Sequence, residues 1–286
     1  QRQDSVYLLT RRPDELRDRF GPRVELVRGD PTQPGDWMET LARCEAVINL
    51  TGENIFNRRW NEDFKKVLRD SRIRSTQNVV QALARARQAG GGPSVLVNAS
   101  AIGYYGPHGD EDLTEDSPPG NDFLARLCVD WEKEARQAET TGVRLALVRI
   151  GVVLDRTAGA LRQMLLPFKL CLGGKVGSGR QQMSWIHHED MVGILLLALD
   201  NSTISGPING TAPNPVSNKE FSKALGRALH RPAIFPVPGF ALRLRFGGVA
   251  EVLLSGQRVL PRVALEKGYV FKYPRIDEAL ADAVKS

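Results

Sequence analysis

A serine and two tyrosines lie close together in residues 97–106, "VNASAIGYYG", at the end of an apolar run. Ser100 could hold a substrate oxygen by a hydrogen bond, and Tyr104 or Tyr105 could act as a general acid or base. A phenol with no cation nearby keeps a pKa of about 10 and is a poor base at neutral pH. The alternative is that both tyrosines pack beneath a loop, with their hydroxyls bonded to the backbone.

A second group of residues could bind a nucleotide. Thr10, Arg11 and Arg12 directly follow the run "VYLL". At the matching strand end of a dinucleotide-binding fold, an acid binds the 2′-hydroxyl of NAD, whereas an arginine can pair with the 2′-phosphate of NADP. Two arginines without an acid therefore favour NADP(H), the alternative being an exposed arginine pair. Asp30 ends the next strand and suits the adenine amino group or, equally well, a helix N-cap.

Small residues end the following strand. Leu50, Thr51 and Gly52 close the segment "AVINLTG" and would let the backbone come close to a cofactor. The carboxyl ends of parallel strands are where open α/β sheets bind their ligands, so these residues and Ser100 belong to one predicted edge.

The elements that position these residues alternate in the manner of βαβ units. We expect strands at residues 5–10, 24–30, 46–52, 94–100 and 144–154, and helices at 34–43, 62–87 and 124–140. The predicted fold is a Rossmann-type doubly wound parallel α/β sheet. Residues 1–155 form the nucleotide-binding domain, and residues 156–286 form the substrate side with a small α+β lobe, residues 181–200 returning to the sheet.

Composition narrows the function classes. The 286 residues carry a net charge of +6, but acids alternate with the basic residues, which is typical of solvated helix faces and argues against a nucleic-acid partner. No apolar run reaches the length of a membrane helix, so no membrane partner is expected. Three widely spaced cysteines match neither a disulfide framework nor a zinc site. We therefore expect a cytoplasmic protein of unpredicted oligomeric state.

Two further motifs could bind ligands. "WIHHEDM", residues 185–191, offers possible metal ligands, but adjacent histidines on a strand point apart, and we expect a strand-to-helix junction with Asp190 in the first turn and no metal. "GGKVGSGR", residues 173–180, lacks the ending of a phosphate loop. We interpret it as a wall of the substrate cleft, where Lys175 or Arg180 could contact an anionic small-molecule substrate.

Several motifs in order resemble one family. They are "INLTGENI", "RW" followed by "SRIRST", "SAIGYYG", "DFLARLCVDWE", "LVRIGVVL", "LGGKVGSGRQ" and "WIHHEDM", and the region from about Pro213 resembles its C-terminal domain. The family is the epimerase-like branch of the extended short-chain dehydrogenases/reductases, also named nucleoside-diphosphate-sugar epimerases or, loosely, cell-division inhibitors. The likeness covers nearly the whole chain.

The resemblance implies a strand and a glycine-rich, pyrophosphate-binding turn ahead of residue 1, which the given sequence lacks. It also implies NADP(H) contacts, which fall on Thr10, Arg11, Arg12, Asp30, Leu50, Thr51, Gly52, Arg72, Ser100, Ile150, Gly151, Val152 and Val153. For Arg72 the alternative is a surface salt bridge.

The proton-transfer pair of this superfamily is absent from the sequence. Its members pair a tyrosine with a lysine four residues on, one helical turn away. None of the five tyrosines has a lysine at that spacing, and "DFLARLC" occupies the family position. The first hypothesis is an NADP(H)-dependent oxidoreductase or epimerase-like enzyme using Ser100 with Tyr104 or Tyr105. The alternative is a non-catalytic NADP(H)-binding regulatory or sensor protein, and an RNA-binding protein of Rossmann type is a more distant one.

Overall fold

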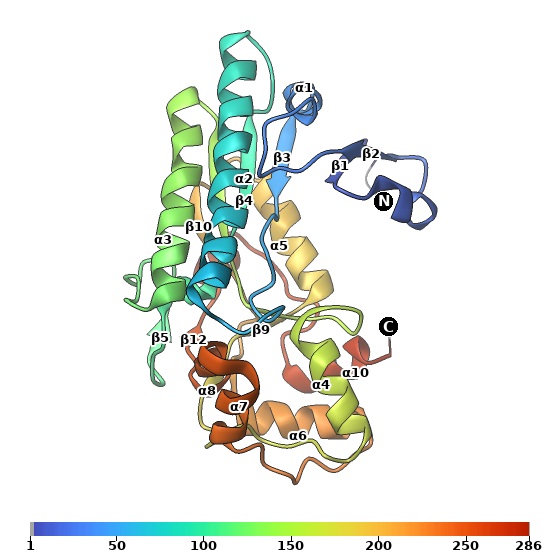
Figure 1. The fold of residues 1–286 in the computed structure, drawn as a ribbon, viewed down its shortest axis with the longest axis vertical. Coiled ribbons are helices and arrows are strands. Elements are labelled where there is room, and N and C mark those ends of the chain that lie inside the picture. The colour runs from blue at the N-terminus through green and yellow to red at the C-terminus, as the bar shows by residue number, and fades with distance from the viewer. Residues whose placement is uncertain (1–2, 286) are drawn as a thin grey trace.

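A parallel four-stranded sheet forms the centre of the computed structural model, which describes residues 3–285. Its order is β10 (Gly206–Gly210), β6 (Arg144–Ile150), β4 (Val95–Ala101) and β3 (Ala46–Asn49), as Figure 1 shows. β1 (Val6–Thr10) and β2 (Val24–Arg28) form a separate parallel pair beside β3. The predicted α/β class and the parallel sheet are therefore confirmed.

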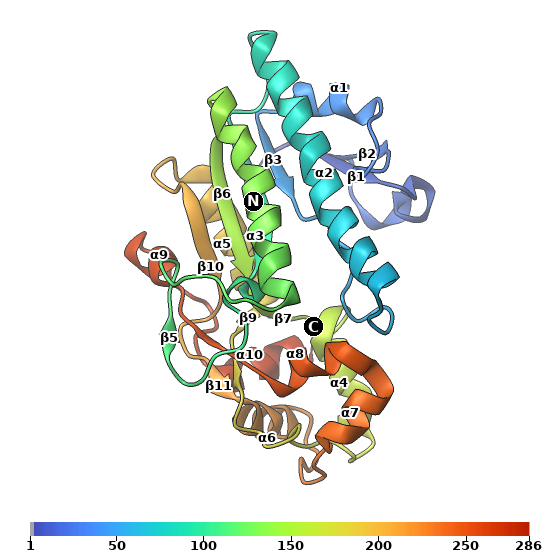
Figure 2. The same cartoon turned by 60° about the vertical axis from the view of Figure 1, so that its left-hand side comes forward.

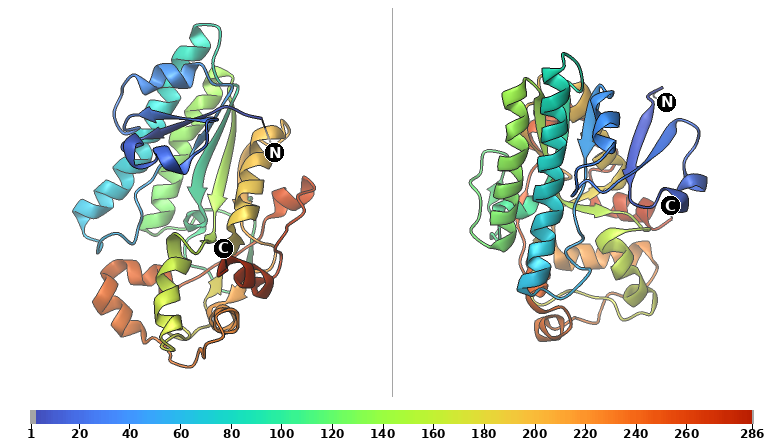
Figure 3. Two further views of the ribbon diagram at one scale, coloured as in Figure 1. Left: turned by 90° about the vertical axis from the view of Figure 1, so that its right-hand side faces the viewer. Right: turned by 45° about the horizontal axis from the view of Figure 1, so that its top comes forward.

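Helices cover both faces of this sheet. α1 (Trp37–Ala42), α2 (Glu62–Gln88) and α3 (Phe123–Ala135) lie on one face, and α5 (His188–Asp200) lies on the other (Figure 3, left). The strands alternate accordingly, since Leu96 packs toward α2 whereas Val95 and Val97 pack toward α5. Burial on both faces explains why β4 and β6 are almost continuously apolar.

The helix starts follow local capping chemistry. Asn61 accepts a hydrogen bond from the Phe64 amide and so caps α2, and Asp122 does the same for α3 through the Ala125 amide. Both helices thus begin within two residues of their predicted starts.

One predicted strand is broken in the structure. The stretch expected as one strand at 144–154 divides at Gly151 into β6 and β7 (Val152–Leu154). β7 leaves the sheet and pairs with β9 (Trp185–His187). A Cβ on Gly151 would lie 2.7 Å from the Ser184 carbonyl oxygen, so the backbones meet too closely there for a larger residue. β10, which sequence reasoning did not predict, occupies the sheet edge beside β6.

A lobe of short elements lies at the carboxyl end of the sheet, at the bottom of Figures 1 and 2. Its core joins Leu154 and Trp185 to α4, α6 and α10. The remaining α-helices and strands are α4 (Gly159–Lys169), β8 (Gln182–Met183), β11 (Val216–Ser217), α6 (Asn218–Ala228), α7 (Gly239–Phe246), α8 (Ala250–Leu254) and α10 (Ile276–Ala283), together with β5 (Asp112–Leu113), β12 (Arg258–Val259) and α9 (Arg262–Glu266). Among the described helices, none has the length and apolarity needed to cross a membrane.

Asp190, in the first turn of α5, joins the lobe to the sheet. Its buried carboxylate accepts hydrogen bonds from the Lys272 amide at 2.8 Å, the Tyr273 amide at 2.9 Å and the Tyr269 hydroxyl at 3.1 Å. Buried backbone amides need a partner, so this single side chain satisfies donors that the chain segment before α10 cannot satisfy by itself.

Replacing Asp190 should therefore destabilise the protein strongly. Asp190→Ala removes a buried acceptor from three part-buried donors, and we expect a loss of about 3 kcal/mol in the free energy of unfolding. Urea denaturation followed by circular dichroism measures it. The matched control is Asp277→Ala, which removes only an exposed ion pair with Arg227 and should cost less than about 1 kcal/mol. Equal losses in the two variants would contradict this role for Asp190.

Candidate nucleotide site and the buried network beside it

The predicted site residues gather along the carboxyl edge of the parallel strands. Thr10 ends β1, Leu50–Gly52 follows β3, Ser100 lies near the end of β4, and Ile150 ends β6. Asn49 pairs with Asn98 and Ser100 pairs with Arg149 across the ladders, which aligns these ends in space. These ladders thus bring together the ends of β3, β4 and β6, which are up to about 100 positions apart in the chain.

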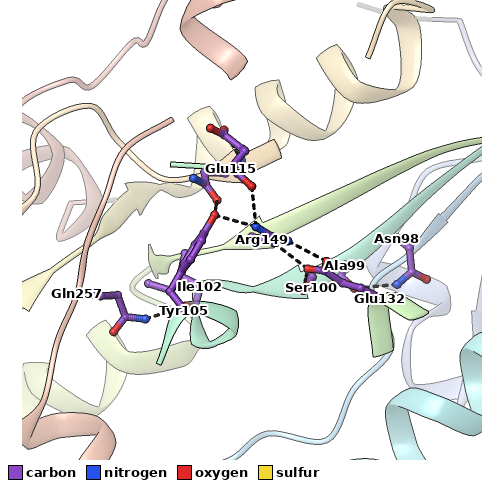
Figure 4. A network of polar contacts seen from close by, with 10 residues as sticks. Asn98, Ala99, Ser100, Ile102, Tyr105, Glu115, Glu132, Arg149 and Gln257 are labelled. Carbon is purple, nitrogen blue, oxygen red and sulfur yellow. Dashed lines mark hydrogen bonds and ion pairs between the residues drawn. The ribbon is translucent and has the colours of Figure 1, made fainter. Parts of the chain in front are cut away.

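Ser100 is held by a buried ion pair rather than open to solvent (Figure 4). Its hydroxyl donates to Glu132 on α3 at 2.7 Å, and Arg149 binds both oxygens of the same carboxylate at 2.8 and 2.9 Å. All three residues are at most 3% exposed. A carboxylate bound by a guanidinium accepts hydrogen bonds and donates none, so the proton of Ser100 points to Glu132 and not to a ligand.

Tyr105 belongs to the same network. It is fully buried, donates to the Asn209 side-chain oxygen at 2.7 Å and accepts from Arg149 at 3.0 Å. Burial raises the pKa of Tyr105 to about 12, although Arg149 and Asn209 act in the opposite direction. The sequence alternative, in which the tyrosine hydroxyls bind the backbone, is wrong for Tyr105, because both partners of its hydroxyl are side chains.

The partners of Arg149 stabilise its charged form. Burial would lower its pKa, but the hydrogen bonds and charge of Glu132 raise the pKa well above its usual value. Its guanidinium also donates to the Glu115 carbonyl oxygen at 3.2 Å. Glu115 in turn accepts from the Asn209 amide at 2.9 Å, and burial raises the pKa of its carboxyl group. The network therefore joins β4, β6, β10 and α3.

Tyr104 differs from its neighbour. It is half-buried, and the Arg149 Cζ atom lies 3.4 Å from the centre of its ring. The rings of Tyr104 and Tyr105 meet edge to face at 5.3 Å. Its hydroxyl takes no part in the hydrogen bonds that hold Ser100 and Tyr105. Of the three predicted catalytic residues, Tyr104 is thus the one whose polar group the fold does not already engage.

The helix that would hold the tyrosine–lysine pair carries apolar residues at those places. Leu124 packs against Gly103, where an added Cβ would lie 3.4 Å from the Leu124 Cβ. Cys128, one turn later, is buried beside Ser100, and burial raises the pKa of its thiol to about 12. Neither residue can transfer a proton at neutral pH.

The two arginines after β1 are exposed and point to different partners. Arg11 lies 3.9 Å from the Asp30 carboxylate, whereas Arg12 pairs with Glu15 at 3.2 Å. Asp30 accepts from the amide and hydroxyl of Thr32, and although burial opposes it these hydrogen bonds keep the pKa of Asp30 below its usual value. Asp30 therefore closes a turn, and its predicted contact with adenine stays a prediction.

The middle of the edge is organised by buried polar side chains. Asn49 accepts from the Thr51 amide at 3.2 Å and donates to Asn98 at 2.7 Å, which orders the turn after β3. Arg72 lies against Gly52, where a Cβ would come within 3.1 Å of its Cζ atom, and it donates to the Glu53 carbonyl oxygen at 3.0 Å. The alternative for Arg72, a surface salt bridge, is not what the structure shows, because its guanidinium binds backbone carbonyl oxygens and burial lowers its pKa, while its predicted cofactor contact stays a prediction.

The run Ile150, Gly151, Val152 and Val153 has packing partners of its own. Ile150 and Val153 contact the core beneath α5, and Val152 contacts the core of the lobe. Their predicted cofactor contacts stay predictions.

The other two motifs have structural roles. His187 ends β9 and caps α5, with its ring 3.9 Å from that of Tyr273. Burial and the charge of His188 lower the pKa of His187. In the glycine-rich turn, Lys175 is half-buried and Arg180 is exposed. Within residues 3–285, no group of His, Cys, Asp and Glu is arranged to bind a metal.

Sequence reasoning missed the network because its members are distant in the chain. Glu132, Arg149, Asn209 and Glu115 were not predicted as a group. A signal existed, since an arginine inside the apolar strand "LALVRI" and a glutamate after Trp131 on the apolar face of a helix each need a buried partner. No spacing rule links residues 132 and 149, however.

The fold and the site define a Rossmann-type nucleotide-binding protein of the short-chain dehydrogenase/reductase kind. The chain belongs to the NAD dependent epimerase/dehydratase family, which it matches over residues 1–209, and residues 237–283 match a domain of unknown function, DUF1731.

Named relatives support this assignment. The mouse epimerase family protein SDR39U1 is 44% identical over 275 residues, with 92% of each chain covered. YfhF of Bacillus subtilis is 38% identical over 98% of this chain and 89% of its own. The crystal structure of human SDR39U1 (isoform 2) with NADPH matches with a TM-score of 0.85 and 38% identity, over 98% of this chain and 91% of that one.

The buried ion pair should be worth much more than a surface pair. Glu132→Gln leaves Arg149 buried without a counter-charge, and we expect the free energy of unfolding to fall by about 3–5 kcal/mol. Glu278→Gln is the matched control, because it removes an exposed pair with Arg275 and should cost less than about 1 kcal/mol. Chemical denaturation measures both, and a small loss in Glu132→Gln would refute a structural role for the network.

Proposed function

We propose that this protein binds NADP(H) along the carboxyl edge of its sheet and reduces a small anionic carbonyl substrate, with Tyr104 as proton donor. The observation that carries the proposal is the stacking of Tyr104 on Arg149. The negative face of the ring attracts the guanidinium, so Arg149 places a positive charge 3.4 Å from the centre of the ring that carries the proton. Arg149 would thus supply the positive charge that a lysine supplies in the usual pair.

The residues at this edge fit NADP(H). Arg11 follows β1, its side chain is 69% exposed, and its ion pair with Asp30 is long at 3.9 Å, so its guanidinium can also pair with a 2′-phosphate. Gly52 has no Cβ, and Leu50 is 55% exposed, which leaves the backbone of this turn open to a flat ligand. The human relative named above was crystallised with NADPH. When bound, this cofactor supplies hydride.

The protein's own residues would then have distinct tasks. Arg11 would choose the phosphorylated nucleotide, Tyr104 would hold and deliver a proton, and Lys175 or Arg180 would attract the anionic substrate. Ser100 would support the Glu132–Arg149 pair beneath Tyr104 instead of binding the substrate. Free cysteines in the described part of the chain agree with a reducing compartment such as the cytoplasm.

A second candidate is the non-catalytic NADP(H) sensor. Leu124 and Cys128 favour it, since they occupy the helical turn where proton transfer would be expected. Both candidates need the same nucleotide site and differ in turnover alone.

Nucleotide preference should depend on Arg11. Arg11→Ala removes a charge-assisted contact worth about 1.5–3 kcal/mol, so the Kd for NADPH should rise roughly tenfold to hundredfold while that for NADH changes little. Fluorescence titration of the full-length protein measures both constants. Arg17→Ala is the control, because Arg17 is similarly exposed and also pairs with an acid, Asp14, but lies on the short helix 17–19 and not at the end of β1. An unchanged NADPH/NADH ratio in Arg11→Ala would show that the assignment is wrong.

Turnover should depend on Tyr104 and not on Tyr105. NADPH oxidation is followed against a panel of anionic carbonyl compounds, and Tyr104→Phe should lower kcat by about a hundredfold or more with an unchanged Kd for NADPH. Tyr105→Phe should melt at a lower temperature yet keep its turnover per folded molecule. Tight NADPH binding with no turnover by the unaltered protein would reject the enzyme and favour the sensor.

A further inference from the structure

Two chain segments of the C-terminal lobe expose an unusual set of large apolar side chains. Leu166, Leu170 and Leu172 are 64%, 60% and 57% exposed, and they lie on and just after α4. Ile234 and Phe235 precede α7, and Phe240 and Leu244 lie on it, at 50–77% exposure. These seven residues are referred to below as the apolar surface. Such a concentration on one lobe indicates a contact with something other than water.

The two segments run beside each other. The Phe235 amide donates to the Gly173 carbonyl oxygen at 3.1 Å, and the Val237 amide donates to the Lys175 carbonyl oxygen at 2.8 Å. The backbone at Phe235 lies so close to Gly174 that an added Cβ there would be 2.2 Å from the Phe235 carbonyl oxygen. α4 and α7 lie at the same end of the molecule in Figures 1 and 2. The apolar surface therefore spans neighbouring parts of one lobe.

α4 is apolar on two sides. Leu161, Leu165 and Phe168 face the core of the lobe, as expected for an amphipathic helix. Leu166 and Leu170 are four residues apart, so they share a face, and that face is turned outward. Leucine side chains that face water do not stabilise the fold. Packing within the lobe therefore does not explain why the outward face of α4 is apolar.

Every charge in these segments is positive. Residues 166–175 and 231–246 contain five basic residues, Lys169, Lys175, Arg231, Arg243 and Arg245, and no aspartate or glutamate. Arg231 also lines a depression of about 670 Å³ together with Lys223, Arg227 and Ile234. Two carboxylates from elsewhere reach these neighbours, Glu251 to Arg243 and Asp277 to Arg227. The excess of basic residues differs from the mixed charges along α2 and indicates an anionic partner.

We propose that the apolar surface docks on an anionic lipid bilayer. Protruding aliphatic and aromatic side chains with basic neighbours can enter the headgroup region, while the basic groups attract anionic lipids. The high exposure of each side chain suits insertion into lipid better than binding of a peptide in a groove. This departs from the sequence prediction of no membrane partner, which rested on the lack of a spanning segment and did not consider peripheral binding. The inference is independent of the proposed reaction.

Vesicle co-sedimentation with the full-length protein tests this. Binding to vesicles of phosphatidylglycerol and phosphatidylcholine should exceed binding to pure phosphatidylcholine by at least tenfold and should weaken as salt is raised. Phe240→Ser with Leu244→Ser, and separately Leu166→Ser with Leu170→Ser, should each lower the affinity by about tenfold or more, because apolar area is no longer buried. Lys169→Glu should lower it roughly fivefold or more.

Val270→Ser is the matched control, since Val270 is 86% exposed but lies outside the apolar surface. It should bind vesicles like the unaltered protein, and thermal melting and NADPH titration should show that all variants remain folded. No binding to anionic vesicles, or equal loss in the Val270 variant, would overturn the proposal. So would a dimer seen by light scattering that the Phe240–Leu244 variant dissociates without any vesicle binding, because the occupant would then be a second copy.

Discussion

The Arg149–Glu132 pair is the interaction on which the centre of the molecule depends. Arg149 on β6 and Glu132 on α3 are both buried, which costs free energy of desolvation. Two hydrogen bonds between them, and further bonds from their neighbours, offset that cost. Ser100 donates to Glu132, and Tyr105 and the Glu115 carbonyl oxygen accept from Arg149, so two residues suited to catalysis serve to hold the ion pair. The Arg149 guanidinium also contacts the face of the Tyr104 ring at the carboxyl edge of the sheet. Structure and candidate chemistry thus rest on one buried pair.

The buried pair also determines which of Ser100, Tyr104 and Tyr105 is available for chemistry. In the sequence, the three residues look equivalent as chemical groups. In the structure, burial separates them, because Ser100 and Tyr105 are closed off by partners and Tyr104 is not. Exposure and hydrogen-bond partners decide which group is free to react, and those partners lie 32 to 104 positions away in the chain.

Much of the fold could be predicted because it follows local rules. Alternating apolar strands and capped helices determine the sheet and the helices that cover it, and Asn61 and Asp122 stand where the helices begin. The break at Gly151 and the extra strand β10 could not be predicted, because both depend on strands that approach from far along the chain. For the candidate site, strand ends predicted which residues share an edge. They could not predict the Glu132–Arg149 pair, which no periodicity links.

The bonds around Asp190 bear on how the two family regions are related. The match to the epimerase family ends at residue 209, and that to DUF1731 begins at 237. Yet Asp190, within the first region, is the acceptor for amides and a hydroxyl of the second, and β12 of the second pairs with β5 of the first. The boundary between the families is therefore not a boundary between folding units. The two regions instead share hydrogen bonds and a strand pair, so a cut between residues 209 and 237 would leave the Lys272 and Tyr273 amides without their acceptor.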